Sequence, residues 1–322
     1  MRPFFNGDLM QLINDIDFID LIIGKDYLEV KGMTGQRDYI SILPSEYHED
    51  AHMLKNECMA IYERDGRTEF SMFHERRLYR ITVIANDISG LTFVVRQTPI
   101  KPRPFGDIPL TTPIKQSVER PDATGLVLIA GEMGSGKTTS AAAMLSHRLH
   151  CVGCLGVSIE DPIETLLEGR HGNGRCFQLE VNGTETYGSA IKKAYRMGSS
   201  AFLLGEIRDA ATANEVLRAS LSMFVVSTIH ASNILDAIER YITFCEEINP
   251  MAAATIANTL YIIAFQKMSH NIRDGKIHSR RVELTAFNLK NAVNAHTISG
   301  KIKTRSLNSL KDDLTGHIEY KL

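Results

Sequence analysis

The sequence has no tryptophan, few cysteines and almost no net charge. Five cysteines in 322 residues argue against a disulfide-bonded secreted protein and are typical of a reducing cytoplasm. A net charge of −2 lacks the overall basic character of most nucleic-acid-binding proteins. No apolar run approaches the roughly 20 residues that span a bilayer, and the acidic N-terminus has no signal-peptide pattern. With 43% apolar and 23% charged residues, the composition predicts a soluble globular protein.

Proline is also scarce, and half of the ten prolines fall in one segment, Pro99–Pro113. Because proline fixes φ and removes a backbone donor, this segment is predicted to be a linker at residues 99–113. It separates an N-terminal domain, residues 1–98, from a C-terminal domain, residues 114–322. The first domain is predicted to be α+β, with a short helix at Leu9–Ile16 followed by strands at residues 20–32, 38–43 and 68–75 and a hairpin at residues 78–97.

The second domain alternates apolar strand patterns with helical patterns. This alternation predicts an α/β fold with a doubly wound, mostly parallel sheet, whose ligands bind at the carboxyl ends of the strands. Beyond it we expect a helical and edge-strand extension, with a long helix at Pro250–Lys267 and a strand at Arg281–Leu289. The predicted strands cover residues 125–131, 155–160, 176–181, 201–206 and 223–230, and the predicted helices begin at Lys137, Tyr187, Ala211 and Leu235.

The segment Gly131–Thr138 reads GEMGSGKT and matches the phosphate-binding pattern G-x-x-x-x-G-K-[ST] between a strand and a helix. Its glycines let backbone N–H groups converge on phosphate oxygens at a helix N-terminus. Lys137 is expected to reach the β- and γ-phosphates, and Thr138 to hold Mg²⁺. The nucleotide-binding residues predicted from this segment are Gly131, Gly134, Ser135, Gly136, Lys137, Thr138 and Thr139.

Hydrolysis also requires carboxylates, and two follow predicted strands. Glu206 ends the run LLGE, and Glu160 ends LGVSIE before a proline turn. Each could instead cap a helix, as acids at such loops often do. His230 ends the next strand, in STIH, where it is either a loop residue or a group that contacts a γ-phosphate. A single C-x-x-C, Cys151 to Cys154, is too few ligands for zinc and is interpreted as two small core residues.

Four boxes therefore follow one another in a fixed order: Gly131–Thr138, Ile159–Glu164, Leu203–Asp209 and Ser227–His230. They resemble the Walker A, Asp, Walker B and His boxes of the type II/type IV secretion ATPases. The likeness spans roughly residues 78–242 and is greatest to pilus-retraction motors and their conjugative or Dot/Icm-like relatives. It implies a RecA-like P-loop NTPase core preceded by a smaller α+β domain of PAS-like type.

The resemblance also implies roles for single residues. Glu160 would be the general base, and Glu206 would hold Mg²⁺ with Thr138, partly through water. His230 would lie near the γ-phosphate. Arg80 and Arg96 would reach nucleotide across a domain or subunit boundary, although each also fits a surface strand arginine. Arg208 and Arg240 fall at family positions where structural ion pairing is an equal alternative.

The chain departs from the family pattern in four places. Leu221–Met223 replaces Thr-Gly-His before the His-box strand, and Gly198–Ser200 replaces the usual Pro-Asp before the Walker B strand. The four-cysteine zinc module of the secretion and pilus-extension motors is missing. A helix of the Ala-Ile-Arg type is not found after Pro250. These departures indicate a divergent member.

The leading interpretation is a homohexameric motor that hydrolyses ATP with Mg²⁺ for pilus dynamics, secretion or conjugation. It implies an inner-membrane platform protein as partner, a cytoplasmic location with peripheral membrane association through partners, and no direct nucleic-acid contact. Two alternatives stay open. One is a RecA-like nucleic-acid translocase, which needs basic contacts to a phosphate backbone. The other is a regulatory subunit that senses nucleotide without hydrolysing it.

Overall fold

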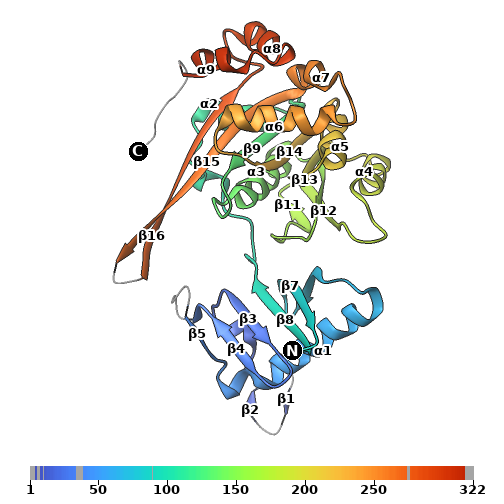
Figure 1. Ribbon diagram of the computed structural model, residues 1–322, viewed down its shortest axis with the longest axis vertical. Coiled ribbons are helices and arrows are strands. Elements are labelled where there is room, and N and C mark those ends of the chain that lie inside the picture. The colour runs from blue at the N-terminus through green and yellow to red at the C-terminus, as the bar shows by residue number, and fades with distance from the viewer. Residues whose placement is uncertain are drawn as a thin grey trace. The chain divides into compact units, whose positions relative to one another are not determined.

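The computed structural model describes residues 4–5, 8–9, 11–33, 39–88, 90–273 and 276–315 (Figure 1). The chain forms two compact units. The N-terminal unit comprises Met1–Lys101 with the short segments Pro162–Leu166 and His270–Arg280. The second unit comprises Pro102–Asp161, Leu167–Ser269 and Arg281–Leu322. Within the described ranges, every helix is too short or too polar to cross a membrane.

The N-terminal unit is built on a six-stranded sheet in the order β5-β4-β3-β8-β7-β6. All of its neighbouring strands run antiparallel. A separate pair is formed by β1 (Phe4–Phe5) and β2 (Asp8–Leu9). The six strands confirm the strands and the hairpin predicted for this region; they are β3 (Asp20–Ile23), β4 (Leu28–Lys31), β5 (Ile40–Ile42), β6 (Glu69–His74), β7 (Arg77–Asn86) and β8 (Gly90–Gln97).

Helix α1, His48–Asp65, is not among the predicted elements. It buries Ala51, Leu54 and Cys58, which lie three to four residues apart and therefore form one apolar stripe in the core of this unit. The predicted helix at Leu9–Ile16 is wrong. Leu9 ends β2, and only one 3₁₀ turn forms, at Ile13–Asp15, with a second at Ser45–Tyr47. Short apolar segments do not distinguish a helix from an extended chain.

The second unit is an α/β fold around an eight-stranded sheet in the order β11-β12-β10-β13-β14-β9-β15-β16. The strands from β12 to β15 pair in parallel, and β11 adds an antiparallel edge. The predicted mostly parallel, doubly wound sheet is therefore confirmed. Its strands are β9 (Gly125–Gly131), β10 (Leu155–Glu160), β11 (Gly169–His171), β12 (Gly174–Glu180), β13 (Ala201–Ile207), β14 (Phe224–His230), β15 (Leu260–Arg273) and β16 (Lys276–Asn288).

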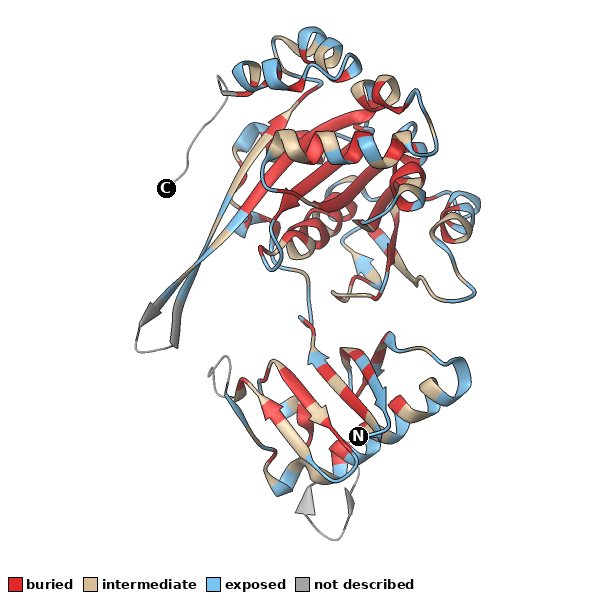
Figure 2. Cartoon of the chain, in the orientation of Figure 1, coloured by how far each residue is buried: buried red, intermediate tan, exposed pale blue. Residues whose placement is uncertain are grey.

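Helices cover both faces of this sheet, and Figure 2 shows that its central strands are mostly buried. On β9, Leu126 and Leu128 face one core cluster, whereas Val127 and Ile129 face the other, as the two-residue period of a strand requires. The first cluster contains residues of α4 (Tyr187–Arg196), α5 (Ala210–Ser220), α6 (Ile234–Glu246), α7 (Ala252–Thr259), α8 (Ala295–Lys303) and α9 (Leu307–Thr315). The second contains residues of α2 (Thr112–Glu119) and α3 (Lys137–Val152), together with Phe105 of the 3₁₀ turn Phe105–Asp107.

Two predictions for this unit need correction. The long helix at Pro250–Lys267 is wrong, because α7 ends at Thr259 and the chain continues as β15. A continuous apolar run that becomes a fully buried strand has no polar alternation to distinguish it from a buried helix. Helix α2 begins inside the proline-rich segment, where Pro113 occupies its first turn and so removes no intrahelical hydrogen bond. The predicted strand at Arg281–Leu289 largely coincides with the second half of β16.

Candidate nucleotide-binding site

The predicted phosphate loop joins β9, which ends at Gly131, to α3, which begins at Lys137. Gly136 is the N-cap of α3 with φ +86°, a left-handed conformation that favours glycine. A Cβ at this position would also lie 3.0 Å from Nε2 of Gln266. Thr138 and Thr139 occupy the first turn of α3, where free backbone N–H groups and the helix dipole favour an anion.

Gly134 and Ser135 form the turn of this loop, and Ser135 supports a phosphate ligand. Its hydroxyl oxygen is buried and has no hydrogen-bond partner within the part of the chain that the structure describes. A buried polar atom without a partner costs free energy that a ligand oxygen would recover. The loop therefore fits a bound phosphate group.

Lys137 is nearly buried and lies across the mouth of the loop. Its Nζ donates to the carbonyl oxygens of Gly131 at 3.1 Å and Glu132 at 2.9 Å. It also lies 3.2 Å from Nδ1 of His230. The structure thus brings the predicted lysine and the predicted histidine into direct contact, although 93 residues separate them in sequence.

Three of the predicted catalytic side chains, Glu160, Glu206 and His230, share one face of the eight-stranded sheet. Alternation along β10 places Glu160 opposite Val157 and Ile159, which face the cluster of α4–α9. Alternation along β14 places His230 on the same side as Phe224 and Val226, which face the cluster of α2 and α3. Because parallel strands end at the same edge, both side chains lie at the carboxyl edge on the α3 side.

Glu206 reaches this face through an irregularity in β13. Leu204 pairs with Ser227 and Glu206 with Thr228, so Gly205 is an extra residue in the ladder. In consequence Leu204 and Ile207, three residues apart, both face the cluster of α4–α9. A regular strand would place Glu206 beside Leu204 on that face. The bulge instead turns Glu206 toward α3 and the phosphate loop.

Gly205 also permits a close approach of Tyr187, the first residue of α4. A Cβ at Gly205 would lie 2.5 Å from the Tyr187 hydroxyl oxygen and 3.3 Å from the carbonyl oxygen of Ile159. Burial raises the pKa of Tyr187, with the Asp161 carboxylate adding to the shift. Two features therefore favour glycine at position 205: it is the extra residue of the bulge, and a side chain there would collide with Tyr187.

His230 joins the lysine to the Walker B carboxylate. Because Lys137 can only donate, Nδ1 of His230 accepts, and the ring proton resides on Nε2. That nitrogen lies 2.7 Å from Oε1 of Glu206. Oε2 of Glu206 lies 3.3 Å from Nε of Arg208. The side chain of His230 remains 40% exposed, so a ligand can reach it.

Glu160 is buried at the end of β10. It accepts hydrogen bonds from the Ser158 hydroxyl and, at 3.3 Å, from Nε2 of Gln178 on the neighbouring strand. Gln178 in turn accepts from the backbone N–H of Leu167 at 2.6 Å. This chain of hydrogen bonds fixes the carboxylate orientation, as a general base requires.

The predicted arginines are held by carboxylates. In the N-terminal unit, Arg80 of β7 and Arg96 of β8 are cross-strand neighbours. Arg80 donates to Glu164 at 2.5 Å. Arg96 forms a bidentate ion pair with Asp20, with distances of 2.8 and 3.2 Å, and the hydrogen bond with Asp20 raises the pKa of Arg96. In the second unit, Arg240 pairs with Asp236 at 2.9 Å, one helical turn away. Arg208, also in the second unit, contacts Glu206 and the carbonyl oxygen of Asp161, each at 3.3 Å.

Gln266 is a site residue that sequence reasoning missed. It is buried on β15 in register with Gly131. Its Nε2 donates to the carbonyl oxygen of Ser135 at 2.6 Å, and its Oε1 accepts from the Ser140 hydroxyl at 2.8 Å. It therefore fixes the phosphate loop to α3. A glutamine inside an apolar run was the available signal, because a buried polar side chain needs partners.

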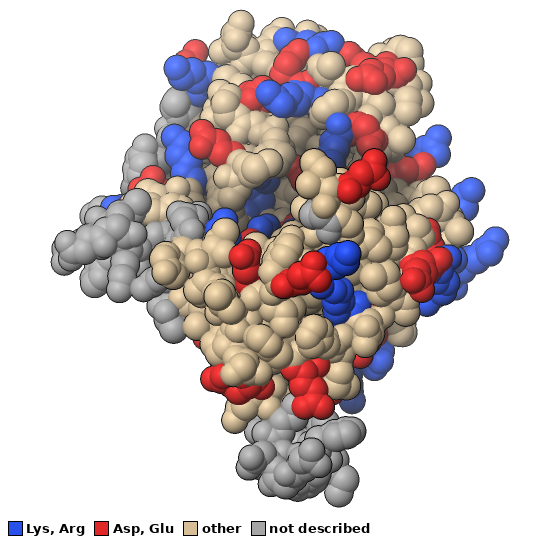
Figure 3. Space-filling model, turned by 60° about the horizontal axis from the view of Figure 1, so that its bottom comes forward, with Lys and Arg blue, Asp and Glu red and all other residues tan. Residues whose placement is uncertain are grey.

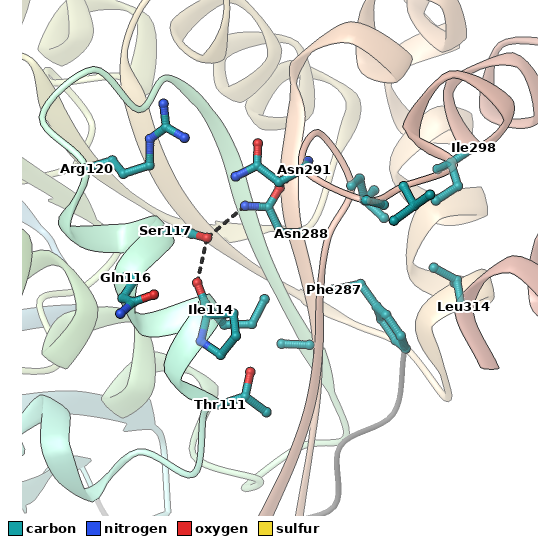
Figure 4. Close-up of a pocket in the computed structure, with 15 residues that line it drawn as sticks. Thr111, Ile114, Gln116, Ser117, Arg120, Phe287, Asn288, Asn291, Ile298 and Leu314 are labelled. Atoms are coloured by element: carbon teal, nitrogen blue, oxygen red, sulfur yellow. Dashed lines mark hydrogen bonds between the residues drawn. The ribbon is translucent and has the colours of Figure 1, made fainter. Parts of the chain in front are cut away.

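A separate pocket of about 710 Å³ lies elsewhere in the second unit (Figure 4). It is lined by residues of α2, β16 and the C-terminal helices, and none of the predicted site residues is among them. Asn288 donates to the Ser117 hydroxyl at 2.9 Å within it. On the face shown in Figure 3, basic and acidic side chains of the described residues are interspersed.

Comparison with known proteins identifies the family of this chain. The sequence model of the family described as "Type II/IV secretion system protein" matches residues 111–317, more than half of the chain. The "Type IV pilus retractation ATPase PilT" of Pseudomonas aeruginosa is 28% identical over 262 residues, covering 78% of this chain and 74% of that protein. The "Competence protein ComGA" of Halalkalibacterium halodurans is 41% identical over 119 residues, which cover 36% of this chain and about a third (32%) of that relative.

Solved structures show the same fold. The pilus retraction motor PilT with bound ADP superposes with a TM-score of 0.74 at 22% identity, covering 93% of this chain and 86% of that one. The ATPase DotB of Legionella pneumophila gives 0.68 at 18% identity, covering 91% and 83%. The four ordered boxes, the site they form and the family match lead to one conclusion: this chain belongs to the type II/IV secretion system protein family of secretion and pilus ATPases.

Proposed function

We propose that this chain is an ATP-hydrolysing motor of a pilus or secretion machine. One observation carries the proposal: Lys137, Glu160, Glu206 and His230 are gathered at one edge of one sheet face, beside a glycine-rich loop that fits phosphate. A protein that only stored nucleotide would need the loop but not two strand-end acids and a histidine. The combination is typical of phosphoryl transfer to water.

Each residue has a defined task in this proposal. Lys137 leaves its carbonyl partners to contact the β- and γ-phosphates, and Glu160 orients the attacking water. His230, whose ring lies beside Glu206, then contacts the γ-phosphate. The Thr138 hydroxyl and the Glu206 carboxylate are oxygen donors of the kind Mg²⁺ prefers, Glu206 partly through water. When bound, the metal neutralises charge on the transferred phosphoryl group.

The proposal extends to assembly. Arg80 and Arg96 would reach nucleotide of a neighbouring subunit, as arginine fingers do, so hydrolysis requires a ring, which we propose to be a homohexamer. Such a motor would act at the cytoplasmic face of an inner membrane through a platform protein. We also propose that residues 1–98 form the domain that moves against the ATPase domain, residues 114–322, about the 99–113 linker. The relatives named for pilus retraction and competence support the assignment to a machine of this kind.

Phosphate release by the full chain tests hydrolysis. Wild type should turn over ATP, and Glu160→Gln should lower turnover by about 10²-fold or more while nucleotide still binds, since general-base catalysis contributes about 10²–10⁴-fold. Glu247→Gln, at an exposed residue after α6, is the matched control and should match wild type. Equal, near-zero rates for wild type and Glu160→Gln would instead indicate a nucleotide-sensing regulator.

Mass measurement in solution tests assembly. Addition of a non-hydrolysable ATP analogue should shift the chain to a six-subunit species, and a strict monomer would refute the ring. Single-stranded DNA should leave turnover unchanged. Stimulation by DNA that falls steeply with salt would identify a nucleic-acid translocase instead.

A further inference from the structure

Three metal-binding side chains converge at the end of α3 that lies away from the phosphate loop. Glu119 is the last residue of α2, and His147 and Cys151 lie one turn apart near the end of α3. Oε1 of Glu119 is 2.9 Å from Nε2 of His147. Sγ of Cys151 is 3.4 Å from the same nitrogen and 3.8 Å from Nδ1. One donor atom from each side chain lies within 4.8 Å of the other two.

The imidazole at the centre of this group is held in place. The Phe105 ring stacks on His147 with centroids 4.3 Å apart and planes 20° apart. Nε2 of His147 faces the Glu119 carboxylate, whereas the Cys151 thiol, at similar distances from both ring nitrogens, lies beside the ring. A single N–H can make one straight hydrogen bond, so hydrogen bonding alone satisfies only one of these two neighbours. An ion bound at Nε2 would contact the carboxylate directly and the thiol after a rotation of the Cys151 side chain.

The position on the helix also favours a cation. Helix α3 ends at Val152, and Gly153 caps it in the left-handed conformation. The negative end of the helix dipole therefore lies beside His147 and Cys151. Ten residues separate Lys137 from His147, about 15 Å along the helix axis, so this group is distinct from the nucleotide site.

We propose that Glu119, His147 and Cys151 bind one Zn²⁺ ion, with water completing the coordination. Thiolate, imidazole and carboxylate are the ligands that zinc takes, whereas a thiolate is foreign to Mg²⁺ and Ca²⁺ sites. Cys151 is exposed, so the fourth position faces solvent. No fourth protein ligand joins the group among the residues that the structure describes. The earlier interpretation of Cys151 as a core residue is wrong, and Cys154 is only partly buried.

The ion would add a direct side-chain link between α2 and α3, which Arg148 of α3 already joins by hydrogen bonds to the carbonyl oxygens of Val118 and Arg120. Helix α2 begins at Thr112 within the proline-rich segment, and α3 carries the phosphate loop at its other end. A zinc ion shared by Glu119 and His147 fixes one helix to the other and keeps the Phe105 ring on His147. Metal binding would therefore stabilise the start of the second unit.

Cobalt substitution tests the site on the full-length chain. Co²⁺ added to metal-free wild type should bind one ion per chain with a sulfur-to-cobalt charge-transfer absorption in the near ultraviolet, and Zn²⁺ should displace it. Cys151→Ser should abolish this absorption and weaken Zn²⁺ binding by at least about 10–100-fold, the usual effect of losing even an indirect partner. Cys154→Ser, three residues away, is the matched control and should keep both.

Thermal unfolding gives a readout that does not depend on ATP hydrolysis. Zn²⁺ should raise the Tm of wild type and of Cys154→Ser but not that of Cys151→Ser or Glu119→Gln. Circular dichroism confirms that each variant is folded before titration. Absence of the charge-transfer band in wild type, or its loss in Cys154→Ser but not in Cys151→Ser, would overturn the proposal.

Discussion

Two histidines, one in each unit, contact carboxylates but have opposite electrostatic surroundings. His230 lies between Lys137 and Glu206, and its side chain is 40% exposed. His74 is buried in the N-terminal unit with a carboxylate at each nitrogen: Asp50 is 3.1 Å from Nε2 and Glu57 is 2.9 Å from Nδ1. Because carboxylates only accept, both nitrogens of His74 must donate, so its ring is a cation. His230 has one donor and one acceptor as neighbours, so its ring is neutral.

The difference shows how hydrogen-bond partners and burial determine whether a histidine stabilises the fold or stays accessible to a ligand. Burial of the ring lowers the pKa of His74, but hydrogen bonds with Asp50 and Glu57 outweigh burial and raise it above its ordinary value of 6.5. Asp50 is fully buried and also accepts from the backbone N–H of Ile13 at 2.7 Å. His74 therefore contributes to folding, whereas His230 remains available to a ligand.

Replacing His74 should have the largest effect. His74→Leu removes the cation and leaves the buried Asp50 carboxylate without it, so the free energy of unfolding should fall by on the order of 3–5 kcal/mol. Urea denaturation of the full chain at pH 6 measures it. His52→Leu, on the exposed side of α1, is the control and should differ from wild type by less than about 0.5 kcal/mol.

Comparison of wild type with His74→Leu also tests the charge on His74. Because its pKa is raised in the folded state, its contribution to stability is complete below the unfolded pKa of 6.5 and is lost as the pH rises through the folded pKa. The free energy of unfolding of wild type, relative to His74→Leu, should therefore decrease from about pH 6.5 upward. A difference that grew with pH would show that His74 is neutral in the fold.

Beside His230, removal of the Lys137 cation should abolish most of the ATP turnover. Lys137→Ala takes away the group that contacts both the phosphate loop and His230, and turnover should fall by about 10²–10³-fold, the usual cost of one preorganised electrostatic partner. Phosphate release measures it. Lys192→Ala, exposed on α4, should retain wild-type turnover.

Substitutions of His230 itself should show that its ring is neutral. His230→Gln keeps a neutral polar side chain, and turnover should fall roughly tenfold, about the worth of one hydrogen bond. His230→Lys places a second cation beside Lys137 and should be far less active. If the lysine variant were the better enzyme of the two, the neutral assignment would be wrong.

The smallest effect should come from the residue that positions Glu206. Gly205→Ala forces the Tyr187 ring away, and turnover should fall about two- to tenfold, equivalent to an off-rotamer cost of ~0.5–1.5 kcal/mol. Adding Tyr187→Phe should restore turnover, because it removes the hydroxyl oxygen. The nearest remaining atom of that ring, Cζ, would lie 3.5 Å from the new Cβ, an ordinary contact distance. A double variant as slow as the single one would assign the effect to the bulge and not to the tyrosine.

The sequence predicted the ATPase core well because its signals are local. Strand, glycine-rich loop and helix adjoin one another around Lys137, and each strand-end acid follows its own apolar run. Helix α1 carries a stripe of Ala51, Leu54 and Cys58, yet polar residues around it weaken the pattern. The run before Gln266 lacks alternation because both faces of β15 are buried, so a helix was predicted there.

Other features depend on contacts between distant residues, which no local pattern contains. Gln266 meets Ser135 and Ser140 across more than 120 residues. His74 meets Asp50 across 24 residues, and Glu119 meets His147 across 28. In each case the residue type was visible in the sequence, but its partner depends on how strands and helices pack.

The extra residue at Gly205 has an evolutionary consequence. Side chains alternate along a strand, so deleting one residue between Leu204 and Glu206 would still leave a well-formed strand with its apolar core. Glu206 would still lie opposite Thr228 and face α3, as it does now, so the deletion would remove the bulge and not the carboxylate. A relative that lacks this residue could therefore keep both the fold and the carboxylate on this face, and a one-residue gap at this point of an alignment would not by itself indicate loss of the site.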